Sequence, residues 1–240
     1  MKILVTAGAT QTPIDKVRAI TNIFKGKTGT QIATILAHIG HNVTLLTSNP
    51  ELVYPDKPRN AGAFHCVLPF AQNNDGASLR AISYRTFDDL AARMEEEIRN
   101  GEYDVVIHSA AVSDYKVARV LVNMSTKDFN LIPLDSSKKI SGSHERMYLE
   151  LVPTFKIVDK IRSEWGFKGF LVKFKLQVGI TDEDLLDIAR RSRETSDADL
   201  IVANCLEWAK EYAYVVDRDS MAEKVTRDGI GPAIARRMHV

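Results

Sequence analysis

Residues 3–10, ILVTAGAT, and residues 29–47, GTQIATILAHIGHNVTLLT, decide the fold of this chain. The first stretch begins with the apolar run 3–6, which small residues close, and this pattern is typical of a buried parallel strand. The second stretch has apolar residues at helical spacing up to Gly40, where the helix is expected to end with a C-cap, and then the apolar run 42–47. Strand, long turn, helix and strand in this order predict a βαβ unit.

The alternation of strands and helices continues along the rest of the chain. Further strands are expected at 63–70, 105–107, 147–152, 169–176, 200–203 and 213–216. Further helices are expected at 86–98, 154–165, 182–196 and 232–238, with Thr181 as the N-cap of the third. This order predicts the α/β class, a Rossmann-like three-layer fold with a mostly parallel sheet covered on both faces. We expect one domain over residues 1–240.

Residues 116–146 break this alternation. The stretch is polar apart from its apolar piece at 120–122. Because long segments without regular patterning are usually functional, we expect an excursion from the sheet at this place, either a flap or a subunit-contact arm.

The bulk composition argues against several classes of protein. The 240 residues carry a net charge of +1, which favours neither nucleic acid nor an acidic membrane as partner. No apolar run approaches the roughly 18 residues of a membrane helix and no secretory leader is recognised, so a cytoplasmic protein is expected. Cys66 and Cys205 lie too far apart for a zinc or redox motif.

Two familiar phosphate-binding motifs are absent. Gly26-Lys27-Thr28 resembles the end of a P-loop, but Thr21 stands where that motif needs its first glycine. The turn after the first strand lacks the pattern G-x-G-x-x-G, since Gly8 is its only glycine, and no acidic residue ends the next strand. The first observation argues against a P-loop that binds a nucleoside triphosphate, and the second argues against NAD as cofactor.

The long turn between the first strand and the first helix is a candidate site. Its length of about 22 residues is unusual for a compact domain, and such loops are often functional. Arg18, Asn22, Lys25 and Lys27 lie on it, and the free backbone N–H groups at 27–29 can bind phosphate. The alternative is a solvated loop without a function.

Two further segments could hold a ligand. Residues 108–115, HSAAVSDY, follow a buried strand with small side chains that let a ligand approach the backbone, and Asp114 could bind a metal or a hydroxyl. A tightly packed turn explains the same residues equally well. Residues 138–143, KKISGS, offer a lysine pair in a loop that suits phosphate oxygens, or simply a solvated charge pair.

These features together resemble the phosphopantothenate–cysteine ligase family. Its motifs T-(A/S)-G-G-T, P-I-D-x-V-R-x-I-(S/T)-N, S-S-G-x-x-G, A-A-V-(A/S)-D-(F/Y), K-I-x-S, (G/S)-F-K-L and (I/V)-(V/I)-A-N recur in whole or in part and in the same order. The matching residues are 6–10, 13–22, 26–29, 110–115, 139–142, 174–176 and 201–204. The length resembles that of the monofunctional bacterial form.

The resemblance implies an activity. Members use a nucleoside triphosphate to convert the carboxylate of 4′-phosphopantothenate into an acyl-nucleotidylate, release pyrophosphate and let the amine of L-cysteine form the amide. This implies CTP or ATP as co-substrate, a requirement for Mg²⁺ and a homodimer whose contact is the arm at 116–146.

The resemblance also implies roles for particular residues. Asn22 holds the acyl-nucleotidylate, Arg18 supports the same loop and Lys139 contacts phosphates, so these three are the expected catalytic residues. The expected nucleotide-binding residues are Gly8, Ala9, Thr10, Ala110, Ala111, Asp114, Phe174 and Lys139. The expected substrate and phosphate contacts are Asn22, Lys25, Gly26, Lys27 and Gly29, and Asp114 is the candidate metal ligand.

Four places depart from the family pattern. Phe24-Lys25 replaces two serines, Ala9 replaces a glycine, Lys173 replaces a small residue, and Cys205 stands where bacterial members often have aspartate. Two other functions stay open on the sequence alone. One is a diverged relative that binds a nucleotide or a pantothenate derivative without ligation, and the other is an NAD(P)-dependent oxidoreductase.

Overall fold

A computed structural model describes residues 1–53, 64–66, 77–123 and 130–238 of the chain. Within these residues the main sheet has nine strands in the order β14-β13-β12-β11-β7-β1-β4-β6-β5. Their bounds are β1 Lys2–Ala7, β4 Asn42–Thr47, β5 Phe64–Cys66, β6 Ser78–Ser83, β7 Val105–His108, β11 Phe170–Gln177, β12 Leu200–Cys205, β13 Tyr212–Val216 and β14 Ala222–Thr226. The strands from β12 to β6 are parallel, and β5, β13 and β14 are antiparallel additions at the two edges.

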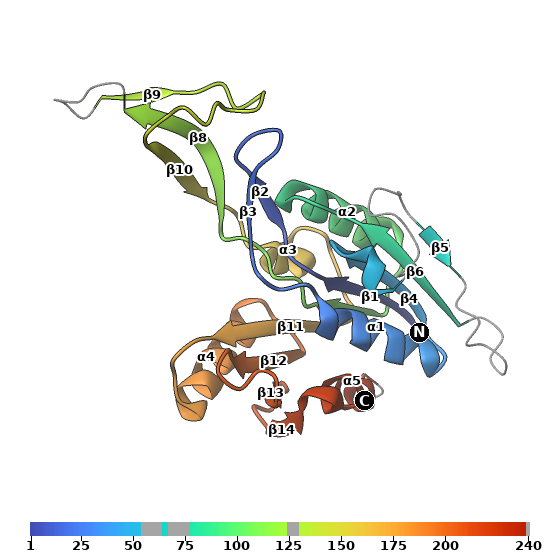
Figure 1. The fold of residues 1–240 in the computed structure, drawn as a ribbon. Coiled ribbons are helices and arrows are strands. Elements are labelled where there is room, and N and C mark those ends of the chain that lie inside the picture. The colour runs from blue at the N-terminus through green and yellow to red at the C-terminus, as the bar shows by residue number, and fades with distance from the viewer. Residues whose placement is uncertain (54–63, 67–76, 124–129, 239–240) are drawn as a thin grey trace.

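Helices cover both faces of this sheet (Figure 1). The helices are α1 Lys27–His38, α2 Phe87–Asn100, α3 Ile157–Ser163, α4 Asp182–Thr195 and α5 Ile230–Arg237. Alternation along β1 shows the two faces, because Ile3 and Val5 pack with α1 and α5 whereas Leu4 packs with α2 and α3. Helix α4 lies on the same face as α2 and α3, over β12. The predicted three-layer α/β fold is confirmed.

The first helix ends as its sequence requires. The N–H of His41 donates to the carbonyl of Leu36 at 3.1 Å, and the N–H of Gly40 donates to that of Ala37 at 3.1 Å. This pair of bonds is the Schellman arrangement, which needs a left-handed residue just past the helix, and Gly40 supplies it with φ 103°. The C-cap itself is Ile39, one residue earlier than expected.

The expected excursion forms a sheet of its own. The strands β8 Tyr115–Asn123, β9 Leu131–Pro133 and β10 Met147–Pro153 pair antiparallel in the order β10-β8-β9, and this arm projects from the main sheet (Figure 1). The strand expected at 147–152 therefore exists as β10 but does not belong to the parallel sheet. It pairs with β8 because a chain that returns from an excursion meets the outgoing strand first.

The long first loop contains regular structure that the sequence did not indicate. A short hairpin of β2 Gln11–Pro13 and β3 Ala19–Thr21 lies beside β8, where the hydroxyl of Thr12 donates to the carbonyl of Tyr115 at 3.3 Å. The loop thus joins the main sheet to the arm.

Other differences concern short or weakly patterned elements. Strands β6 and β14 were not expected, α3 is shorter than the helix predicted at 154–165, and the last helix begins two residues earlier than predicted. Of the strand predicted at 63–70, only β5 lies within the described residues. Among the helices that the structure describes, none is both long and apolar enough to span a bilayer.

Replacing Gly40 by alanine tests the role of its backbone conformation. A left-handed φ is costly for a residue with a Cβ, so Gly40→Ala should lower the free energy of unfolding by about 1 kcal/mol. The control is Gly142→Ala, since a Cβ at Gly142 meets nothing within 4 Å. Urea denaturation of both variants measures the difference; equal stabilities would contradict the assignment.

Candidate active site

The candidate site lies where the strand order reverses. From β1 the chain builds β4 and β6 on one side and then returns to place β7 on the other, so β1 and β7 flank the switch point at which α/β sheets usually bind ligands. Two backbone bonds join the turns that follow these strands: the N–H of Ala111 donates to Gly8 at 2.8 Å, and the N–H of Thr10 donates to Ala111 at 3.2 Å. The structure therefore brings together the predicted residues Gly8, Ala9, Thr10, Ala110 and Ala111.

The N-terminus of α1 lies directly against the first of these turns. A Cβ on Gly26 would lie 2.2 Å from the backbone nitrogen of Gly8, so the two backbones touch. One turn further along α1, a Cβ on Gly29 would lie 2.3 Å from Oγ of Ser109. Helix α1 has no side-chain N-cap, which leaves the N–H groups of its first turn without an intrahelical partner or side-chain cap at this point. Such groups bind anions.

A buried hydroxyl fixes the second turn. Oγ1 of Thr6 accepts the N–H groups of Ser109 and Ala110, each at 3.1 Å, and lies 3.0 Å from Nδ1 of His108. Because the two N–H groups occupy its lone pairs, the hydroxyl donates its hydrogen to Nδ1, and this network assigns the neutral imidazole with its proton on Nε2. Burial, with the nearby charge of Lys173, lowers the pKa of His108 to about 4.

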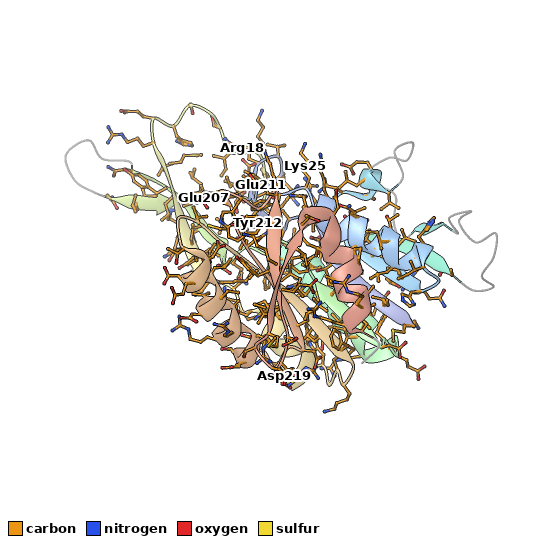
Figure 2. All side chains as sticks on the ribbon, turned by 90° about the horizontal axis from the view of Figure 1, so that it is seen from below. Arg18, Lys25, Glu207, Glu211, Tyr212 and Asp219 are labelled. Carbon is orange, nitrogen blue, oxygen red and sulfur yellow. The ribbon has the colours of Figure 1, made fainter. Side chains whose placement is uncertain are left out.

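The first loop brings Asn22 to the same place. Its Nδ2 donates to the carbonyl of Ala111 at 3.0 Å, and the neighbouring hydroxyl of Thr21 donates to Thr10 at 3.1 Å. The side chains of Asn22, Lys25 and Lys27 are exposed. Lys25 and Arg18 lie at the end of the molecule opposite to Asp219 (Figure 2).

Arg18 and Lys139 belong to two segments that contact each other. The guanidinium of Arg18 pairs with Asp15 and donates to the carbonyl of Ile140 at 2.9 Å. Lys139 precedes Ile140, and its side chain is exposed. The loop that follows β9 is therefore held against the first loop, and the predicted residues Arg18 and Lys139 lie on either side of the junction.

Comparison with known proteins places this geometry in a family. Residues 1–228 match the model of the DNA/pantothenate metabolism flavoprotein C-terminal domain. The chain belongs to this family.

Alignments with two named relatives cover most of the chain. The coenzyme A biosynthesis bifunctional protein CoaBC of Thermococcus kodakarensis is 32% identical over 94% of this chain and 47% of its own length. The phosphopantothenate–cysteine ligase of Mus musculus is 23% identical over 92% of this chain and 77% of its own. The chain spans about half the length of the bifunctional relatives that it matches.

A solved structure agrees with the fold over the full length. The crystal structure of the DNA/pantothenate metabolism flavoprotein from Streptococcus pneumoniae has a TM-score of 0.77 and 31% identity, and the alignment covers 100% of this chain and 98% of that one. The resemblance stated from the sequence motifs is therefore confirmed.

Asp114 and Phe174 belong to different strands of the main sheet or the segments that follow them: Asp114 lies in the segment after β7, and Phe174 lies within β11. The carboxylate of Asp114 is exposed and pairs with Lys156, and Phe174 is half-buried against the core on the α1 side. No group of three or more histidine, cysteine or acidic side chains that could hold a metal occurs among the described residues. One exposed carboxylate is nevertheless compatible with Mg²⁺ that arrives with a triphosphate, because phosphate oxygens and water supply most of its ligands.

The residues that depart from the family pattern differ in burial: Lys173 and Cys205 are buried, whereas Phe24 is exposed. Nζ of Lys173 donates to the carbonyl of Ser192 and the hydroxyl of Ser196, both at 2.9 Å, so this side chain lies under α4 on the face opposite to Phe174. Burial lowers the pKa of Lys173 to about 8. Cys205 is buried as well, and its thiol donates to Glu207. Phe24, by contrast, is exposed and not part of the core.

Sequence reasoning did not identify four residues that shape the site. From the sequence, Thr6 belongs to an expected strand, His108 to the turn that follows another, Asp15 to a motif, and Ser48 directly follows the strand expected at 42–47. The hydroxyl of Ser48 accepts the N–H of Ala9 at 3.0 Å. The rule that sites form at the carboxyl ends of parallel strands could have found Ser48, since it follows β4.

The buried neutral His108 predicts a pH dependence of stability. Its pKa falls from about 6.5 in the unfolded chain to about 4 in the fold, so the unfolded state binds the proton more readily between these values. The free energy of unfolding should therefore fall by about 3 kcal/mol as the pH drops from 6.5 to 4.

Denaturant titrations at several pH values measure this effect. The matched variant is His108→Gln, which should lose this part of the pH dependence, whereas His144→Gln, at a half-buried position in the loop before β10, should keep it. An unchanged pH profile in His108→Gln would show that the titrating group is another one.

Proposed function

We propose that this chain ligates 4′-phosphopantothenate and L-cysteine to 4′-phosphopantothenoylcysteine, a step of coenzyme A biosynthesis, with CTP or ATP as co-substrate. The observation that carries the proposal is the meeting of the uncapped α1 N-terminus, the Gly8 turn and the amide of Asn22 at the switch point of the sheet. The choice of this reaction is supported by relatives named as phosphopantothenate–cysteine ligase and as coenzyme A biosynthesis bifunctional protein.

The site suits the activation of a carboxylate by a triphosphate. Attack of the carboxylate on the α-phosphorus concentrates negative charge on phosphate oxygens, which backbone N–H groups and lysine side chains stabilise when they are already in place. The first turn of α1 supplies the N–H groups, and Lys25, Lys27 and Lys139 supply mobile positive charge. A magnesium ion bound to the triphosphate would add charge neutralisation, with Asp114 as its protein ligand.

The second step needs positioning more than a strong base. The amine of cysteine is itself a good nucleophile, and an activated acyl group held beside it reacts mainly because the two are oriented. Asn22 is suited to hold the acyl-nucleotidylate because its Nδ2 is already bonded to Ala111, which turns its other amide atom, Oδ1, away from that carbonyl and leaves it free for the substrate.

We also propose a homodimer in which the arm of β8, β9 and β10 forms the contact. The support is a set of large apolar side chains that this arm exposes: Tyr115, Ile132, Met147 and Leu151. Exposed apolar groups gathered on one projecting element are typical of a protein–protein contact. The single domain over 1–240 and the cytoplasmic location stay predictions.

Pyrophosphate release tests the proposed function. Release should require phosphopantothenate, Mg²⁺ and a nucleoside triphosphate, and the amide product should appear only when L-cysteine is added. Parallel reactions with CTP and with ATP identify the co-substrate. Tight nucleotide binding without release would indicate a binding protein instead, and oxidation of NADPH would indicate an oxidoreductase.

Asn22→Asp tests the role of the amide. A carboxylate at this position loses the bond to Ala111 and no longer orients the bound acyl group for attack by the amine, so turnover should fall roughly 100-fold while the acyl-nucleotidylate accumulates. The matched control is Asn100→Asp on the last turn of α2, also exposed, which should react like the unmodified protein. Unchanged turnover in Asn22→Asp would remove Asn22 from the mechanism.

A further inference from the structure

A buried carboxylate collects donors from two distant parts of the chain. The side chain of Asp15 has no solvent exposure. Its Oδ1 accepts the N–H groups of Val17 and Arg18, both at 2.9 Å, which closes the turn of the β2–β3 hairpin. Its Oδ2 accepts from Nε and Nη2 of Arg18 and from the N–H of Ile140 at 3.1 Å. Oδ1 thus stabilises the turn of the hairpin, and Oδ2 connects the hairpin to the loop that follows β9.

Ile140 is held by its backbone and by its side chain. Its N–H donates to Asp15, and its carbonyl accepts from Nη2 of Arg18 at 2.9 Å, so both backbone groups are bonded to the first loop. Its side chain is buried, whereas those of Lys139 and Ser141 on either side are exposed. Ile140 is therefore the anchor of an otherwise exposed loop.

We propose that Asp15 is a positioning residue that places Lys139 at the active site through Arg18 and Ile140. The proposal rests on the proposed function, in which Lys139 contacts the phosphates. Consecutive Cα atoms lie about 3.8 Å apart, so fixing Ile140 also fixes the point from which the Lys139 side chain starts. The exposed lysine side chain itself can still adjust to the position of the substrate.

The charges at the junction keep it assembled at neutral pH. The Arg18 guanidinium, followed by the N–H groups of Val17, Ile140 and Arg18, holds the pKa of Asp15 well below its usual range despite the opposing effect of burial. A buried carboxylate of this kind depends on all its partners, because removing one leaves charge or a donor uncompensated. Arg18 connects the two loops in the same way, because its guanidinium contacts both Asp15 and the carbonyl of Ile140.

Asp15→Asn distinguishes the roles of the two carboxylate oxygens, because it keeps one oxygen and replaces the other with an NH₂ group. The amide oxygen can stay on the N–H groups of Val17 and Arg18 and keep the turn. The new NH₂ group then faces the N–H of Ile140 and the guanidinium, which are themselves donors, so the junction to the arm is lost. The matched control is Asp135→Asn in the same loop: Oδ1 of Asp135 accepts the N–H of Ser137 at 2.9 Å, and an asparagine preserves that turn.

Hydrogen exchange of the Ile140 amide tests the junction without any substrate. In Asp15→Asn the amide loses its acceptor and should exchange about tenfold faster or more, while Asp135→Asn should leave it unchanged. If Asp15→Asn does not fold, Asp15→Ser serves in its place, since a hydroxyl can cap the turn but is too short to reach Ile140. Unchanged exchange at Ile140 overturns the proposal.

A double-mutant cycle then tests the connection to Lys139. Turnover should fall about tenfold or more in Asp15→Asn, and it should fall in Lys139→Ala, but the double variant should be no slower than Lys139→Ala alone. Effects that multiply in the double variant show that Asp15 acts by another route and overturn the proposal. If the wild-type protein has no ligase activity, the proposed function is wrong. The exchange rate of the Ile140 amide then still tests whether Asp15 holds the loop that contains Lys139.

Discussion

The contact between the backbones of Gly8 and Gly26 is the constraint on which the site depends. No side chain fits between the end of β1 and the start of α1, because a Cβ on Gly26 would lie 2.2 Å from one backbone atom of Gly8 and 2.7 Å from another. The residues between the two glycines must therefore leave the sheet and return to the same point. They do so as the β2–β3 hairpin, which carries Asn22 back to the switch point and extends Asp15 and Arg18 toward the arm.

Polar groups of the backbone, more than charged side chains, make the fixed part of the site. The turns after β1 and β7 are bonded to each other and to the hydroxyls of Thr6 and Ser48, so the backbone of these turns is pre-organised before any ligand arrives. The charged groups that we propose to contact the phosphates, Lys25, Lys27 and Lys139, are exposed. This division suits a reaction that first binds a triphosphate and then admits a second substrate, since rigid donors lower the cost of reorganisation and flexible lysines can follow the phosphates.

The sequence predicts the parallel sheet well because hydrophobic period and turn chemistry are local. The stretch from β1 through Gly40 to β4 is a complete βαβ unit, and Gly40 adopts the left-handed conformation that its position suggested. The arm is different: β10 reads as one more strand of the alternation, and only its pairing with β8 separates it from the main sheet. Which strand pairs with which is a property of the folded chain.

The same distinction applies to the residues of the site. Gly8, Asn22 and Ala111 could be named from motifs and lie together in the structure. Asp15 and Thr6 could not be assigned their roles, because these consist of hydrogen bonds to residues 125 and 103 positions away. Lys173 follows the same rule, since it stands next to the predicted nucleotide-binding residue Phe174 in the sequence, yet strand alternation turns its side chain under α4.

The central claim is that the α1 N-terminus, the Gly8 turn and the Lys139 loop bind one nucleotide together. The most direct measurement is a titration of the ¹⁵N-labelled protein with CTP or ATP in the presence of Mg²⁺, followed through the backbone amides by NMR. The amides of Gly8, Gly26, Gly29 and Ile140 should shift together with one affinity, and that of Asp219, at the opposite end of the molecule (Figure 2), should not. Saturation with nucleotide that leaves the three glycine amides unmoved would contradict the account.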